Sequence, residues 1–160
     1  MAVTILLVRH ARAGRRDRWE GDDRLRPLTK RGRAQAAALP RIVAPWTGGA
    51  ASQPLLLTSP WVRCVETLAP LAAHTGTVAE TEPLLGEGMG AATVDVLPKW
   101  VGPVPVVLCT HGDVIEEILA KLAASGVDVG PEPRAAKGSV WVLDGGDGTV
   151  RGARYLPPPA

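Results

Sequence analysis

Residues 3–14 read V-T-I-L-L-V-R-H-A-R-A-G, so that a continuous apolar run ends directly at Arg9 and His10. An uninterrupted apolar run of this length is typical of a strand that is covered on both faces, as in the parallel sheet of an α/β protein. Ligands of such proteins bind beyond the carboxyl ends of the strands. The stretch therefore predicts a central strand and the first part of a functional site.

The rest of the chain alternates between apolar, strand-like runs and helical patterns, which is typical of repeated βαβ units. We expect a three-layer α/β/α sandwich with a mostly parallel central sheet. A helix is expected to begin after Thr29 and to bury Ala34, Ala37, Ala38, Ile42 and Val43. Further helices are expected at 61–74 and 113–124, further strands at 55–58, 104–110, 139–143 and 150–155, and a hairpin turn at 145–148.

The chain has 160 residues, of which 46% are hydrophobic and 21% are charged, as in one globular domain. We expect a single domain over residues 1–156 and a proline-rich tail over 157–160. The apolar run at residues 3–8 is too short to span a bilayer, and it lacks the basic leader and cleavage site of a signal peptide. We therefore expect a cytoplasmic protein with no membrane partner, in which Cys64 and Cys109 are reduced core thiols.

The net charge of +2 hides a strong asymmetry along the chain. Residues 1–41 carry a charge of +7, residues 42–133 carry −7, and residues 134–160 carry +2. Fourteen of the 18 cations are arginines, and ten of these precede residue 42. Because arginine makes bidentate contacts with phosphate and carboxylate groups, an anionic ligand is the first functional inference. Solvated surface arginines are the alternative for any single arginine outside a motif.

Three chemically distinctive side chains follow three of the expected strands. His10 and His111 come directly after two of these strands. Arg63 lies one turn into the helix that follows the expected strand at 55–58. Cations beside an imidazole lower its pKa below the ordinary value of about 6.5. With Arg9 and Arg63 close by, His10 would be neutral at pH 7 and able to attack phosphorus, while the two arginines bind phosphoryl oxygens. This pattern predicts phosphoryl transfer through a covalent phosphohistidine.

Four segments of the chain form a collinear set of motifs: L-V-R-H-A-R-A-G at 7–14, S-P-W-V-R-C-V-E-T-L at 59–68, L-G-E at 85–87 and T-H-G-D at 110–113. Together they resemble the motifs of a known family, the histidine phosphatase or phosphoglycerate mutase-like superfamily. R-P-L-T-K-R-G at 26–32 further resembles the small SixA-type phosphohistidine phosphatase branch. K-G-S-V-W-V-L at 137–143 is similar to the histidine phosphatase domain that follows a Nudix domain in some MutT-type hydrolases.

The resemblance implies a phosphoglycerate mutase-like fold and assigns roles to four residues. His10 would be the nucleophile, and Arg9, Arg63 and His111 would form the phosphate pocket. No metal and no cofactor are implied. Ala11 departs from the family, which usually has glycine at this position.

Two further residues are candidates for the site. Glu87 corresponds to the acidic position that protonates the leaving group in many relatives, although a loop carboxylate is the alternative. Arg26 is the expected substrate contact of the Arg-rich loop at residues 12–26. A chain of 160 residues leaves little for a lid, so hydrolysis is favoured over mutase action, and a shallow site could receive a protein side chain.

The favoured function is therefore a metal-independent, SixA-like phosphatase acting on a histidine-phosphorylated protein. A phosphatase of a small nucleotide or sugar phosphate is the enzymatic alternative, suggested by the Nudix-linked resemblance. The alternative without catalysis is a module that binds nucleic acid or an acidic protein surface through the basic N-terminal third, with Trp19 and Trp61 stacking on bases. We do not expect nucleic acid as the partner, because the family motifs account for the key arginines.

Other chemistries are excluded by spacing. A cysteine phosphatase needs an arginine six residues after its cysteine, but Pro70 and Ile115 occupy these positions after Cys64 and Cys109. No G-x-x-x-x-G-K-[ST] loop is present. The three dispersed histidines and two dispersed cysteines show no zinc spacing.

Overall fold

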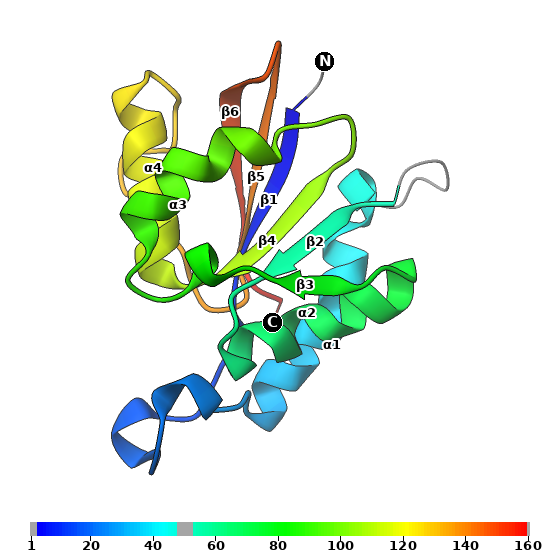
Figure 1. Cartoon of the computed structure of the whole chain (residues 1–160), viewed down its shortest axis with the longest axis vertical. Helices are drawn as coiled ribbons and strands as arrows, with labels where there is room; N and C mark the ends of the chain where they lie inside the picture. Colours follow the sequence, from blue (N-terminus) through cyan, green and yellow to red (C-terminus); the bar gives the residue numbers. More distant parts are fainter. Residues whose placement is uncertain (1–2, 48–52, 160) are drawn as a thin grey trace.

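The computed structural model describes residues 3–47 and 53–159, and its centre is a six-stranded sheet in the order β3-β2-β4-β1-β5-β6 (Figure 1). The strands are β1 (Val3–Arg9), β2 (Leu55–Thr58), β3 (Ala79–Thr81), β4 (Val106–Thr110), β5 (Val140–Gly146) and β6 (Thr149–Leu156). The α-helices are α1 (Lys30–Thr47), α2 (Val62–Thr75), α3 (Gly90–Val96) and α4 (Gly112–Ala124). Strands β1 to β4 pair in parallel, whereas β5 and β6 pair antiparallel. The predicted α/β fold with a mostly parallel sheet is confirmed.

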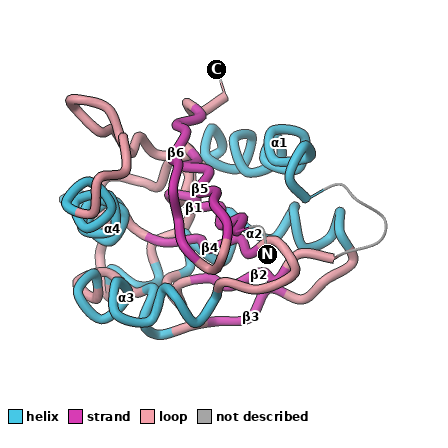
Figure 2. Tube along the Cα trace, turned by 90° about the horizontal axis from the view of Figure 1, so that it is seen from above, coloured by secondary structure: helices cyan, strands magenta, loops and turns pink. Residues whose placement is uncertain are grey.

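Helices cover both faces of the sheet, with α1 and α2 on one side and α3 and α4 on the other (Figure 2). Alternate side chains of β1 point to opposite faces. Ile5 and Leu7 join the core beneath α4, and Leu6 and Val8 join the core beneath α1 and α2. All four are fully buried. This two-sided burial is the reason why the run contains no polar alternation.

The predicted hairpin is also present, as β5 and β6. Its turn places Asp147 at φ +55° and Gly148 at φ +73°. Two successive residues with positive φ fit the tight turn that matches the twist of paired strands, and the Asp-Gly sequence favours this turn. The turn chemistry therefore accounts for the antiparallel edge of the sheet.

Some details of the prediction were wrong. Strand β3 was not predicted, because it has three residues, none of them buried, and shows no alternation. Strand β4 begins at Val106 rather than Val104. Helix α1 begins after Thr29 as predicted and continues through Pro40 and Pro45, but the predicted buried positions differ in part. Its buried face consists of Gly32, Gln35, Ala36, Leu39, Val43 and Thr47, while Ala34 and Ala37 are exposed.

The segment 12–29, here called the arm, leaves the sheet beyond the carboxyl end of β1 and leads into α1 (Figure 1). It contains the short 3-10 helices η1 (Arg16–Arg18) and η2 (Asp23–Leu25). Its two ends are joined by a bridge between Ala13 and Leu28. The arm is therefore a closed loop beside the expected ligand edge of the sheet.

The division into a domain at 1–156 and a tail at 157–160 stays a prediction. Residues 1–2, 48–52 and 160 lie outside the described residues. None of the described helices combines the length and the apolarity that crossing a bilayer requires.

Candidate active site

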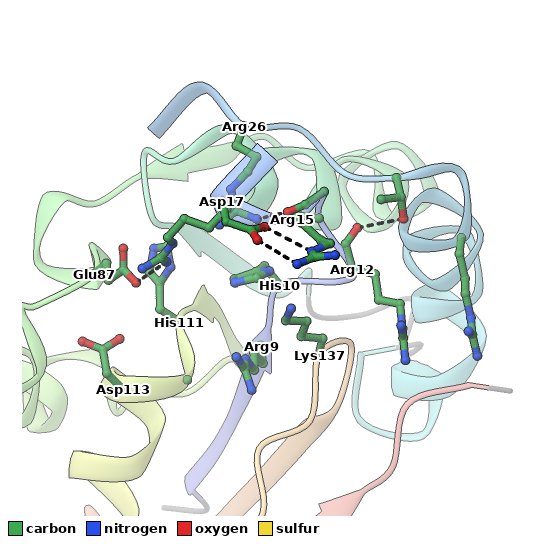
Figure 3. A pocket seen from close by; sticks show the side chains of 16 residues that line it. Arg9, His10, Arg12, Arg15, Asp17, Arg26, Glu87, His111, Asp113 and Lys137 are labelled. Atoms are coloured by element: carbon green, nitrogen blue, oxygen red, sulfur yellow. Dashed lines mark hydrogen bonds and ion pairs between the residues drawn. The ribbon is translucent and has the colours of Figure 1, made fainter. Parts of the chain in front are cut away.

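A pocket of about 760 Å³ opens at the carboxyl edge of the sheet, between the ends of β1 and β4 and the arm (Figure 3). Seven of its lining residues are arginine or lysine. Five of the six predicted site residues line it, and Arg63 does not. The lining consists of Arg9, His10, Arg12, Ala13, Gly14, Arg15, Arg16, Asp17, Arg26, Thr29, Arg31, Glu87, His111, Gly112, Asp113 and Lys137.

His10 directly follows β1 and is 5% exposed. Its Nδ1 lies 2.8 Å from the carbonyl oxygen of Ala11. A carbonyl oxygen only accepts, so Nδ1 carries the proton and Nε2 keeps its lone pair. Burial lowers the pKa of His10 to about 3 against the opposing effect of the Ala11 hydrogen bond, and the charges of His111, Arg63 and Arg9 lower it further. The imidazole is therefore neutral at physiological pH.

The low pKa of His10 predicts a specific loss of stability in acid. Between the unfolded pKa of about 6.5 and the folded pKa of about 3, only the unfolded chain takes up the proton. The free energy of unfolding should therefore fall by about 1 kcal/mol per pH unit on acidification through this window because of His10 alone. Urea unfolding of the wild type and of His10→Gln between pH 6.5 and 4.5 measures this slope. Identical slopes in the two proteins would contradict the assignment.

His111 lies beside His10 at the end of β4, with the ring centroids 5.5 Å apart. Its Nε2 is 2.8 Å from Ser59 Oγ, and its ring packs edge-on against Trp61. Its Nδ1 is buried and has no hydrogen-bond partner in the part of the chain that the structure describes. The Ser59 contact thus fixes the ring and leaves one nitrogen for a ligand.

Arg9 contributes a cation from the last position of β1. One Nη donates to the carbonyl oxygen of Ala135. The guanidinium lies against the start of α4, where a Cβ at Gly112 would come within 2.9 Å of Arg9 Cζ. Among the described residues Arg9 forms no ion pair. Its charge is therefore available to an anion.

Arg63 is fully buried and is not among the side chains that line the pocket, and its place in the phosphate pocket stays a prediction. Its Nη1 donates to the Asp23 carbonyl oxygen at 2.9 Å, and its Nη2 lies 3.1 Å from Asp23 Oδ2 and 3.4 Å from Glu87 Oε2. The guanidinium thus ties the arm to the 3-10 helix η3 (Pro83–Leu85) and the loop after it.

Glu87 and Arg26 line the pocket but are held by protein partners. Glu87 Oε1 accepts from Arg16 at 2.8 Å, and its other oxygen faces Arg63. Arg26 is 5% exposed and donates to Asp23 Oδ1 at 2.8 Å and to the carbonyl oxygen of Gly14. Arg26 therefore stabilises the arm in this arrangement.

Sequence reasoning missed several residues of the site. Asp23 pairs with three arginines, but nothing in the spacing of the arm marks it. Ser59 lies within the quoted motif at 59–68, but nothing in that motif showed that its hydroxyl faces His111. Lys137 and Asp113 lie within quoted motifs, and these motifs were the available signal. Within the described ranges, no three His, Cys, Asp or Glu residues are grouped as metal ligands.

An α/β sheet whose carboxyl edge carries a neutral, buried histidine in a cationic pocket defines a class of protein that handles phosphoryl groups. The chain belongs to the histidine phosphatase superfamily, branch 1, whose family model matches residues 5–94. The chain is 42% identical over 162 residues to the 8-oxo-(d)GTP phosphatase of Mycolicibacterium smegmatis. The match covers 98% of this chain and 48% of the relative, so the chain spans about half the length of that protein.

Solved structures share the fold at low sequence identity. The protein histidine phosphatase SixA in complex with tungstate has a TM-score of 0.70 and 17% identity, and the match covers 97% of this chain and 95% of that one. A mycobacterial glucosyl-3-phosphoglycerate phosphatase in complex with VO3 has a TM-score of 0.66 and 18% identity, with 96% and 97% covered.

Proposed function

We propose that the chain hydrolyses a phosphate group of a small nucleotide through a covalent phosphohistidine on His10. The observation that carries the proposal is the neutral His10, whose Nδ1 is committed to Ala11 and whose Nε2 retains its lone pair in a cationic pocket. A nucleophile that is neutral at pH 7 needs no base to remove a proton before attack.

In the first step, His10 Nε2 bonds to phosphorus while the bond from phosphorus to the leaving oxygen breaks. Arg9 and the Nδ1–H of His111 donate to the phosphoryl oxygens and stabilise the charge of the transition state. In the second step, water bonds to phosphorus, the N–P bond breaks, and inorganic phosphate leaves. The lone pair returns to Nε2, and the water proton leaves with phosphate or to solvent.

Glu87 is the proposed donor of a proton to a poor leaving group. It lines the pocket, but its two oxygens face Arg16 and Arg63. A terminal phosphate of a nucleoside di- or triphosphate departs from another phosphate, which leaves readily without a strong proton donor. The arrangement of Glu87 therefore suits a phosphate leaving group better than an alkoxide.

The relative from Mycolicibacterium smegmatis supports the nucleotide substrate. Its name describes an 8-oxo-(d)GTP phosphatase, and it is 42% identical to almost the whole of this chain. The SixA-type motifs favour a phosphohistidine protein as substrate, with a small nucleotide as the alternative. The SixA likeness is at 17% identity and supports the fold alone, so we now place the nucleotide first.

The substrate class is tested with the purified chain in the absence of added metal. Initial rates of phosphate release are compared for 8-oxo-dGTP, its di- and monophosphate forms, a sugar phosphate and a histidine-phosphorylated protein. We expect kcat/KM for the best of the three nucleotides to exceed kcat/KM for the sugar phosphate and for the histidine-phosphorylated protein by about tenfold or more. A similar margin in favour of the phosphohistidine protein would return the assignment to the SixA-type activity, and salt-sensitive RNA binding without turnover would favour the binding module.

A further inference from the structure

Three cations that line the pocket have no part in the chemistry proposed above. They are Arg12, Arg31 and Lys137. Arg16 and Arg26, at the same pocket, each pair with a carboxylate. No ion pair between described residues includes any of the three. Their charges are thus uncompensated within the described parts of the chain.

One buried side chain holds the backbones of two of these cations. Gln35 is 9% exposed and lies on the inner face of α1. Its Oε1 accepts from the backbone N–H of Arg12 at 3.0 Å, and its Nε2 donates to the carbonyl oxygen of Lys137 at 3.5 Å. Two segments that are far apart in the sequence are therefore fixed side by side.

The start of α1 fixes Arg12 relative to Arg31. The carbonyl oxygen of Arg12 accepts from Thr29 N at 2.9 Å and from Thr29 Oγ1 at 3.3 Å. A Cβ at Gly32 would lie 2.0 Å from that oxygen, so this approach requires glycine. Arg31 belongs to the same first turn, where the positive end of the helix dipole also favours an anion.

Lys137 lies in the positive field of several arginines of the pocket. Burial and the neighbouring charges of Arg9, Arg26, Arg12 and Arg16 lower the pKa of its amine. A bound anion would relieve this repulsion and is therefore favoured there.

We propose that Arg12, Arg31 and Lys137 form a second phosphate subsite, which binds the phosphates that stay with the nucleotide. The inference rests on the proposed function, and it makes nucleoside di- and triphosphates the preferred substrates over monophosphates. Figure 3 shows Arg12 and Lys137 on the side of His10 away from Glu87. When the terminal phosphate of a nucleotide lies at His10, the next phosphate would then face Arg12 and Lys137. The pocket of about 760 Å³ has room for more than one phosphate group.

Binding without turnover tests the subsite. Calorimetry compares methylphosphonate, which has one phosphonate group, with methylenediphosphonate, which has two. The wild type should bind the diphosphonate about tenfold or more tightly. Lys137→Met and Arg12→Met should each lose most of this preference and bind methylphosphonate within about twofold of the wild type. Lys30→Met is the control variant. Lys30 is an exposed cation in the first turn of α1, next to Arg31, but it does not line the pocket.

The outcomes separate the subsite from the proposed function. The subsite is overturned if the wild type binds methylenediphosphonate no more tightly than methylphosphonate. It is also overturned if the Arg12 and Lys137 variants lose affinity equally for both ligands. A loss as large in Lys30→Met as in Lys137→Met also overturns it, since the effect would then be one of general charge. The protein could also prefer the diphosphonate, lose this preference in the Arg12 and Lys137 variants, and yet hydrolyse no nucleotide. That result would support the subsite and refute only the proposed nucleotide activity.

Discussion

Replacing His10 by glutamine is expected to lower kcat/KM for phosphate release by about 10⁴-fold, the scale seen when a covalent nucleophile is removed. The Nδ1–H bond to Ala11 and the low pKa leave His10 as a neutral nucleophile, and a glutamine amide has no comparable lone pair. The variant should also carry no phosphate. The wild type, quenched in alkali during turnover, should carry alkali-stable, acid-labile phosphate on one histidine.

The matched control for this experiment is His74→Gln. His74 lies in the last turn of α2 and does not line the pocket, so this variant should keep wild-type turnover and labelling. Circular dichroism confirms that both variants are folded at the assay pH. Turnover by His10→Gln within about tenfold of the wild type would exclude His10 as the nucleophile.

The central sheet could be predicted from the sequence because its pattern is local. β1 is apolar at every position from Ile5 to Val8, and the Asp-Gly turn between β5 and β6 has a specific backbone requirement. The placing of His10 and His111 at one edge followed from parallel pairing, since β1 and β4 are direct neighbours in register. Local pattern and topology were enough to bring the two histidines together.

The contacts of the arm could not be predicted in this way. Asp23 is separated from Arg63 by 40 residues, and its pairing depends on the path of the irregular segment 12–29. The same holds for Lys137, whose carbonyl oxygen accepts from the Gln35 amide that also accepts from the backbone N–H of Arg12. Such contacts follow from three-dimensional packing and have no periodicity. The pairing of Arg63 with Asp23 therefore had no signal in the sequence.

Arg63→Met is expected to have the second largest effect, because Arg63 is both buried and paired. Removing Arg63 takes away the one fully buried cation of this cluster and leaves Asp23 and Glu87 paired with the more exposed Arg16, and Asp23 also with Arg26. Both carboxylates are about one-third exposed, so we expect the free energy of unfolding to fall by about 2 kcal/mol, below the range for fully buried pairs. Urea unfolding measures this loss. Arg41→Met, an exposed arginine of α1, removes the same charge and should leave stability within about 0.5 kcal/mol.

The same variant should lower kcat/KM by about 10²-fold, and its combination with Asp23→Asn separates two explanations. If Arg63 only anchors the arm, Asp23→Asn alone should reproduce the loss, and adding Arg63→Met should change nothing further. If Arg63 exchanges Asp23 for a phosphoryl oxygen when substrate enters, Arg63→Met should still cost about 10²-fold in the Asp23→Asn background. We expect the second result, because Asp23 presents to Arg63 the same kind of charged oxygen that a phosphate would present. A null effect of Arg63→Met in that background would reduce Arg63 to a positioning residue of the arm.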